Sequence, residues 1–287
     1  HQYCGALGKQ ANCQCLVSLT AARDDVPAPV GLRLYLPEEW TTDPARCAKA
    51  LVPESIGYRP KWRIALDEVD RLSASGVRFG CVLADAGYGM CAAFRRGLTE
   101  RGFAWAVGIL STQNVYADDV EVSIPERPPG KSGRPRVRPI ADSAPLSAAK
   151  FIAKHVVFRS VAWRKGTKGP LTGEFAVARV RPADGPETND GVHLPGDPAW
   201  LVCKRLSNGD REFYLVNLPA SASAKKIVRA IKARWACEQM HQQMKEELGL
   251  DHFEGRSWLG LHHHAVLTMV AFAFLLHVRL TENKSAA

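Results

Sequence analysis

The chain has 287 residues, of which 46% are hydrophobic and 23% are charged, and this composition excludes a disordered or fibrous protein. A globular chain of this length forms one large domain or two. The net charge of +9 favours a polyanionic partner, most simply nucleic acid, although a mild basic excess alone is a weak signal.

Eight cysteines are scattered along the chain without a Cys-x-x-Cys pair or zinc-finger spacing. Several lie within apolar runs, where a thiol behaves as a small hydrophobic group. We therefore expect reduced cysteines in the cytoplasm and no disulfide framework. The eight are Cys4, Cys13, Cys15, Cys47, Cys81, Cys91, Cys203 and Cys237.

The N-terminal third predicts alternating strands and helices. Residues 11–20 and 30–36 are rich in β-formers and predict an antiparallel pair, and residues 61–75 have the apolar spacing of a helix. Residues 77–84 predict a buried strand, followed by a helix over 90–101 and a strand over 104–110. Strand, helix and strand in this order predict a βαβ unit and a partly parallel sheet.

Asp85 stands at the end of the buried strand and is followed by Ala86-Gly87-Tyr88-Gly89. Three interpretations are open: a turn residue, a dinucleotide-binding loop, or a metal-binding carboxylate held by the rigid strand. The second is weak, because the loop lacks the third glycine and the later acidic residue of that motif.

Residues 112–219 predict a β-rich insertion of short strands, with a hairpin turn at Asn208-Gly209 and a polar linker over 182–198. Residues 125–139 form a loop rich in Pro and Gly that cannot pack a core. Its cations either follow a DNA backbone or are simply solvated. They are Lys131, Arg134, Arg136 and Arg138.

Residues 225–249 predict one long helix that ends at Gly249. On this helix Glu238 shares a stripe with Arg234 and Lys245 and with apolar neighbours, which favours a functional site. The alternative is a surface ladder of ion pairs. Residues 262–278 predict an apolar core helix, since the run 265–276 is too short to span a membrane.

The spacing of Arg234, Glu238 and Lys245 resembles the Tyr-Arg-Glu-Lys motif of DDE-type insertion-sequence transposases, with Ile231 at the tyrosine position. The segment GLDHFEGRSWLGLHHH resembles the stretch that follows this motif, and ADAGYG around Asp85 resembles the segment of the second catalytic Asp. The resemblance implies an α/β fold: an RNase H-like mixed sheet with flanking helices, formed by residues 1–111 and 220–287 and interrupted by the β-rich insertion 112–219 before the long helix.

In that family three carboxylates bracket two Mg²⁺ or Mn²⁺ ions. The resemblance assigns Asp85 and Glu238 as catalytic metal ligands, and Arg234 and Lys245 as contacts to DNA phosphates. It implies cleavage and strand transfer of double-stranded DNA at transposon ends and target, in the cytoplasm at the bacterial nucleoid, with a homodimer on the DNA as an option and without a membrane.

The first Asp of the family triad is expected on a strand that precedes His1, because the nearest acids, Asp24 and Asp25, lie in a turn. The chain begins at His1 rather than Met, so we expect the natural protein to extend further. We then expect residues 1–287 to bind DNA without cleaving it. Two alternatives are a DNA-binding remnant without catalysis and a nucleotide-binding α/β enzyme built on the Asp85 loop.

Overall fold

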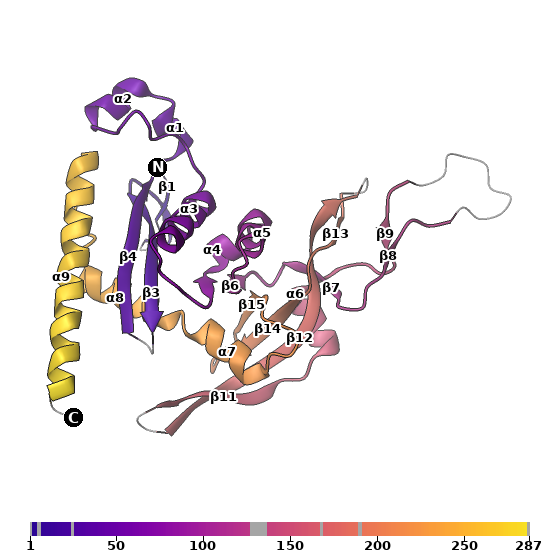
Figure 1. The fold of residues 1–287 in the computed structure, drawn as a ribbon. Coiled ribbons are helices and arrows are strands. Elements are labelled where there is room, and N and C mark those ends of the chain that lie inside the picture. The colour runs from indigo at the N-terminus through magenta and orange to yellow at the C-terminus, as the bar shows by residue number, and fades with distance from the viewer. Residues whose placement is uncertain are drawn as a thin grey trace. The chain divides into compact units, whose positions relative to one another are not determined.

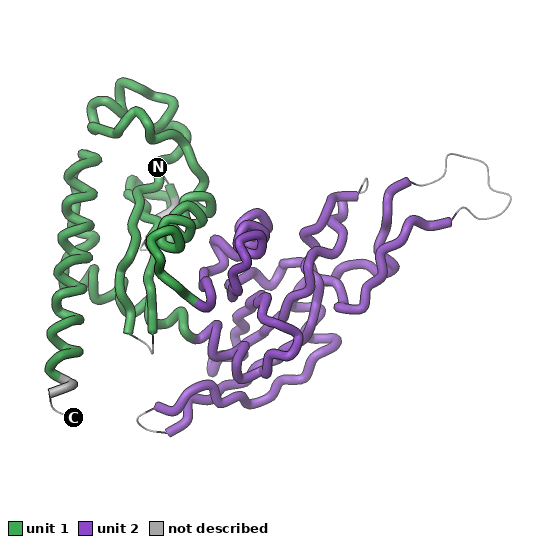
Figure 2. Tube along the Cα trace, in the orientation of Figure 1, with its two compact units in different colours: residues 1–79, 233–287 green, residues 80–232 purple. Residues whose placement is uncertain are grey.

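The computed structural model describes residues 2–4, 7–23, 26–126, 137–166, 169–188 and 191–285. The chain forms two compact units (Figure 2). Unit 1 consists of His1–Phe79 and Ala233–Ala287, and unit 2 is the continuous segment Gly80–Lys232.

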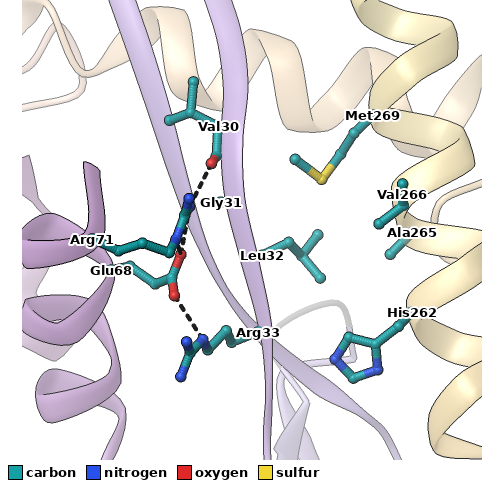
Figure 3. A pocket seen from close by; sticks show the side chains of 10 residues that line it. All are labelled: Val30, Gly31, Leu32, Arg33, Glu68, Arg71, His262, Ala265, Val266 and Met269. Carbon is teal, nitrogen blue, oxygen red and sulfur yellow. Dashed lines mark hydrogen bonds and ion pairs between the residues drawn. The ribbon is translucent and has the colours of Figure 1, made fainter. Parts of the chain in front are cut away.

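Unit 1 is built on the antiparallel pair of β3 (Cys15–Arg23) and β4 (Val26–Tyr35), which confirms the predicted hairpin. Both strands extend further toward the turn than their sequence pattern indicated. Helix α3 (Lys61–Ala74), also as predicted, packs on one side of the pair, and α9 (Trp258–Ser285) lies on the other side (Figure 3). The remaining elements of unit 1 are β1 (Gln2–Cys4), β2 (Lys9–Ala11), α1 (Glu38–Thr41), α2 (Pro44–Lys49) and α8 (Trp235–Glu246).

The core of unit 1 joins the two ends of the chain. Met240 and Met244 of α8 pack against Ala265 and Phe272 of α9, with Leu32 of β4 at the edge of the cluster. These side chains are brought together across more than 200 residues of sequence, so the hairpin depends on the C-terminal helices for its apolar cover.

The sequence predicts a buried core helix near the C-terminus; the helix forms, but most of it is exposed. Helix α9 is longer than predicted and apolar around most of its circumference. Of the helices in the described part of the chain, it alone is long and apolar enough to cross a membrane, over Trp258–Glu282 with mean hydropathy 1.6. Only 22% of that window is buried, because unit 1 covers a single side of it.

Unit 2 contains a mixed sheet with the strand order β10-β7-β12-β14-β15-β6-β5. Its strands β12, β14 and β15 are labelled in Figure 1. Strands β5 (Val82–Ala84) and β6 (Trp105–Ile109) are parallel, which confirms the predicted βαβ unit, and the other neighbours are antiparallel. Strand β5 is shorter than predicted, since it begins at Val82 rather than Val77. Helices α4 (Ala86–Gly89) and α5 (Ala92–Glu100) connect the parallel pair.

The β-rich segment supplies most of this sheet. Its central strands are β12 (Gly169–Glu187), β14 (Ala199–Arg205) and β15 (Arg211–Val216), and the last two are joined by the predicted turn, in which Gly209 has φ 89°. The other elements are β7 (Asn114–Ala117), β8 (Val122–Ser123), β9 (Ile140–Ala141), β10 (Leu146–Ser147), α6 (Ala148–His155), β11 (Arg159–Gly166) and β13 (His193–Pro195).

Two features of this segment differ from the sequence analysis. Helix α6 was not predicted, although Ser147 caps it by accepting the Lys150 N–H. The expected linker over 182–198 is partly strand, since β12 continues through Pro182 and pairs with β7 and β13. Pro182 has no N–H to donate, but its carbonyl oxygen accepts the Gly196 N–H at 2.7 Å, so proline is tolerated at this position of the strand.

The predicted long helix is broken at Ala233 and Arg234 into α7 (Ala224–Lys232) and α8. Ile227, Val228 and Ile231 of α7 are buried in the core of unit 2, whereas the buried face of α8 belongs to unit 1. Each half therefore packs into the core of its own unit. The continuous stripe of charged and apolar residues expected along an unbroken helix does not form.

Candidate functional site

Asp85 lies where β5 ends, as the sequence predicts. It is the N-cap of α4, and its Oδ1 accepts the Tyr88 N–H at 3.3 Å. This cap fixes the start of the short helix and leaves the carboxylate on the surface of unit 2, where it is exposed. The side chain is thus accessible and is held at one end by a rigid strand.

Two glycines let the Asp85 loop lie directly on the sheet. A Cβ atom added to Gly89 would stand 1.9 Å from the carbonyl oxygen of Gly108 on β6, and one added to Gly108 would stand 3.0 Å from the Ala86 nitrogen. The backbones of α4 and β6 therefore approach more closely than any side chain permits. These contacts set the position of Asp85 relative to the parallel strands.

Arg95 anchors the same loop from within unit 2. Its side chain is 2% exposed; Nη1 donates to the Gly89 carbonyl, and Nη2 lies 2.6 Å from Asp184 Oδ2 of β12. The guanidinium thus connects α5, the Asp85 loop and the long central strand. Neither Arg95 nor Asp184 was predicted from the sequence, because nothing in a local pattern pairs residues that are 89 positions apart.

Glu238 lies on the exposed side of α8 in unit 1. Its side chain is 55% exposed and forms an ion pair with Arg234 Nη2 at the start of the helix. The buried side of α8 carries Ala236, Met240 and Met244 instead. Arg234 and Glu238 therefore form the ion pair that the surface-ladder interpretation predicts, and the Glu238 carboxylate remains accessible to solvent.

A chain of polar contacts seats α8 on β3. Ser18 Oγ lies 2.9 Å from His241 Nε2, Cys237 Sγ lies 3.7 Å from His241 Nδ1, and Thr20 Oγ1 lies 3.1 Å from Cys237 Sγ. Burial lowers the pKa of His241, and the nearby charge of Lys245 lowers it further. Burial of the imidazole therefore favours its neutral form, and the contacts fix the ring one helical turn beyond Glu238.

This environment predicts that unit 1 loses stability in mild acid. The folded-state pKa of His241 is below the ordinary value of about 6.5, so the unfolded chain binds the proton more readily. The free energy of unfolding should thus decline as the pH falls from about 6.5 toward the lower, folded-state pKa. Urea unfolding between pH 5 and pH 8 measures this decline. His241→Gln should flatten it, whereas His252→Gln, which alters a side chain that is 77% exposed, should leave it unchanged; equal profiles for all three proteins would contradict the assignment.

A buried carboxylate fixes α3 to the hairpin of unit 1. Glu68 is 2% exposed and lies 2.6 Å from Arg33 Nε and 2.8 Å from Arg71 Nη2 (Figure 3). A Cβ atom on Gly31 would come within 2.7 Å of Glu68 Oε2, so glycine is needed for the carboxylate to fit. A cavity of about 260 Å³ lies beside this cluster, between β4 and the residues His262, Ala265, Val266 and Met269 of α9.

The other predicted DNA contacts are distributed over both units. Lys245 is exposed near the end of α8 and, within the described part of the chain, forms no ion pair with Glu238. Arg138 is exposed in unit 2. Lys131, Arg134 and Arg136 lie outside the described residues, as do Asp24 and Asp25.

The net positive charge of the protein lies entirely in unit 2, and unit 1 is neutral overall. Residues 80–232 contain 23 Lys and Arg against 14 Asp and Glu, whereas the rest of the chain contains 15 of each. The whole excess of +9 therefore lies in the unit that carries Asp85 and the β-rich segment. This division of the charge was not predicted, because the boundaries of the units are not visible in composition.

Asp85 and Glu238 suit a hard divalent cation in their chemistry, since both are exposed carboxylates on well-defined elements. They belong to different units, and each is described only within its own. Among the described residues, no group of three or more His, Cys, Asp or Glu side chains is arranged to hold a metal ion. His262 and His264 instead bond the carbonyls of Trp258 and Gly249, as expected for packed helical histidines.

The protein has a mixed α/β fold with flanking helices, and an exposed carboxylate lies where a parallel strand ends. Proteins of this class bind their ligands at the carboxyl ends of the parallel strands. Residues 1–170, more than half of the chain, match the family described as DDE superfamily endonuclease. The chain therefore belongs to this family, and its fold is the RNase H-like one that the resemblance implied. A comparison with curated proteins finds no match.

Membership makes the chain an enzyme of the nuclease and transposase type whose substrate is DNA. Enzymes of this superfamily generally use divalent metal ions. The matched residues include Asp85 and its loop but end before Glu238. The role of Glu238 and the Tyr-Arg-Glu-Lys motif therefore remain predictions.

Proposed function

We propose that the protein is the transposase of an insertion sequence, which cleaves DNA at the ends of the element and joins them to a target. The observation that carries the proposal is Asp85, an exposed carboxylate at the end of a parallel strand, within the part of the chain that matches the endonuclease family. The proposed catalytic core is formed by residues 1–111 and 220–287, and the β-rich segment 112–219 interrupts it.

In this proposal Asp85 and Glu238 are the two metal ligands that the chain supplies from described residues. Mg²⁺ or Mn²⁺, two ions in a complete site, would activate the attacking oxygen and stabilise the leaving one. The capped loop and its glycine contacts hold Asp85 in place before substrate binds. The contacts of His241 with Ser18 and Cys237 hold the helix that carries Glu238.

Arg234 has two roles in the proposal. Its ion pair orients the Glu238 carboxylate while no substrate is bound. The planar guanidinium can instead contact a DNA phosphate, which would leave the Glu238 carboxylate free to serve as a metal ligand. Lys245, which is exposed on α8 about two turns beyond Glu238, adds a point charge that can contact the same DNA backbone.

The proposal is tested with a DNA fragment that carries the ends of the encoding insertion sequence, together with a target plasmid. The product of the complete reading frame should cleave at the ends and join them to the plasmid when Mg²⁺ or Mn²⁺ is present. If the protein cleaves the ends but does not join them to the plasmid, it is an endonuclease without strand-transfer activity, and the proposal is contradicted. Binding to the fragment without cleavage would favour a DNA-binding remnant.

The confinement of charge to unit 2 predicts where DNA binding depends on salt. Phosphate contacts release counterions, so affinity should fall steeply with salt concentration. Replacing Arg134, Arg136 and Arg138 with Ala should reduce the slope of log affinity against log salt by up to about 2.7, since each phosphate contact contributes roughly 0.9. Fluorescence anisotropy with a labelled duplex measures the slope.

The matched control for this experiment removes the same charge from unit 1. Lys9, Lys49 and Arg78 are exposed there, and their replacement with Ala changes the net charge of the protein equally. The control should preserve the slope because no local phosphate contact is lost. Identical slopes for both triple variants and the unaltered protein would show that Arg134, Arg136 and Arg138 make no contact with DNA phosphates.

A further inference from the structure

The cavity of unit 1 has a charged side and an apolar side. It encloses about 260 Å³ and is lined by residues of β4, α3 and α9. Figure 3 shows the charged side chains of Arg33, Glu68 and Arg71 on the α3 side of the strand. On the α9 side the cavity is lined by His262 and by the apolar residues Leu32, Ala265, Val266 and Met269. A site of this form suits a small molecule with one charged end and an apolar body.

The charged side of the cavity carries an excess of positive charge. Glu68 is 2% exposed and is shared by two guanidinium groups. Arg33 Nε lies 2.6 Å from its Oε1, and Arg71 Nη2 lies 2.8 Å from its Oε2. Arginine side chains in proteins are always charged, so the single carboxylate neutralises only one of the two cations. The cluster therefore attracts an anion.

The two arginines are held in place, and one of them has free donors. Arg71 Nε donates to Glu68 Oε2 at 2.9 Å, and its Nη2 donates to the Val30 carbonyl at 2.7 Å. Arg33 is 48% exposed, and within the described part of the chain its two terminal nitrogens donate no hydrogen bond. Its Nε contact with the buried carboxylate orients the guanidinium. The terminal N–H groups thus remain available for the paired hydrogen bonds that a carboxylate accepts.

The volume and lining of the cavity limit the ligand to a small aliphatic one. Sites for drug-sized ligands enclose roughly 300–1,000 Å³. A cavity of about 260 Å³ is smaller than these, so it fits a short molecule better than a nucleotide. The DNA backbone is a poor match for the α9 side, because a sugar-phosphate chain is polar and charged, whereas Ala265, Val266 and Met269 are apolar.

We propose that this cavity binds a small carboxylate with a short aliphatic body. The carboxylate accepts hydrogen bonds from the terminal nitrogens of Arg33, and the aliphatic part lies against Leu32, Val266 and Met269. Neither Asp85 nor Glu238 lines the cavity, so the proposal does not depend on the proposed transposase activity.

A bound ligand should also stabilise unit 1. Leu32 and Met269 line the cavity, and both pack against the cluster that contains Met240 and Met244 of α8. The complete cavity exists only in the folded protein, because its walls come from distant parts of the chain. A ligand that binds only the folded form raises the melting temperature as its concentration rises.

The test is calorimetric titration of the full chain with 4-methylpentanoate, matched by the neutral 4-methylpentanamide. The carboxylate should bind saturably with a Kd on the order of 1 mM, as expected for a ligand of few atoms, and should raise the melting temperature. The amide should bind at least about tenfold more weakly, because it lacks the charge that the arginines recognise. No saturable binding of the carboxylate, or equal affinities for the two probes, would overturn the proposal.

Two neighbouring residues of α9 provide a variant and its matched control. Val266 lines the cavity and is 55% exposed, whereas Leu267 is 69% exposed and does not line it. Val266→Glu should weaken binding of the carboxylate by at least about tenfold, because it places a like charge beside the ligand. Leu267→Glu adds the same charge to the same helix and should leave the Kd unchanged within about twofold.

The circular dichroism of both variants should match that of the unaltered protein, because the altered side chains are exposed. The comparison of acid and amide on the unaltered chain tests the site even if a variant fails to fold. Equal losses of affinity in the two folded variants would contradict the assignment to this cavity. Displacement of 4-methylpentanoate by duplex DNA would show that the arginines contact the DNA backbone instead, and would also overturn the proposal.

Discussion

Glu238→Gln is expected to lower metal-dependent DNA cleavage by at least ~100-fold, and Asp85→Asn by a similar factor. Even partners that only support a metal ligand change affinity or activity by about 10–100-fold, and these two carboxylates are the proposed ligands themselves. The amides preserve size and remove the negative charge. Nicking of DNA by the product of the complete reading frame in Mg²⁺ measures the effect.

The loss should not arise from unfolding. Glu238 is 55% exposed, and its pair with Arg234 is a surface pair within one helix, which contributes about 0.3–0.5 kcal/mol. Glu246→Gln is the matched control, because Glu246 is an exposed carboxylate two turns further along α8. If Glu238→Gln and Glu246→Gln cleave equally well, Glu238 is an ordinary surface residue and the motif has no catalytic role here.

Arg95→Met is expected to destabilise unit 2 by about 3–5 kcal/mol, because it removes a buried guanidinium and leaves the Asp184 carboxylate, which is only 13% exposed, without this partner. The substitution also frees the Gly89 carbonyl, so the Asp85 loop loses its anchor. Urea unfolding followed by the fluorescence of the tryptophans measures the change. A difference below about 1 kcal/mol would mean that the pair is solvated.

Two further variants sharpen this prediction. Arg96→Met changes the next residue of α5, which is exposed, and should have little effect. Combining Arg95→Met with Asp184→Leu should recover part of the lost stability, since replacing both partners of a buried pair is often nearly neutral. Additive losses in the double variant would show that the two side chains do not act through each other.

Elements set by local pattern could be predicted from the sequence. The β3–β4 hairpin and α3 follow from their apolar spacing, and the parallel pair around Asp85 follows from strand, helix and strand in short succession. The position of Asp85 at the strand end was also predictable, because the Gly-rich loop after an apolar run leaves few other conformations.

Features set by distant packing could not be predicted. Ala233 and Arg234 favour a helix, and the break there exists because α7 and α8 are buried in different cores. Likewise, an apolar run identifies α9 as a helix that needs cover, but the sequence does not say how much of it the fold provides. The Arg95–Asp184 pair depends on strands that meet only after folding.

The division into units has a consequence for synthesis of the protein on the ribosome. Unit 2 is one continuous segment, so all of its strands have been made once residue 232 leaves the exit tunnel. Unit 1 must wait for residues 233–287, because α8 and α9 supply the cover for the β3–β4 hairpin. The β3–β4 hairpin is thus made before unit 2 but completes its fold after it, and during that interval the hairpin is an exposed target for chaperones and proteases.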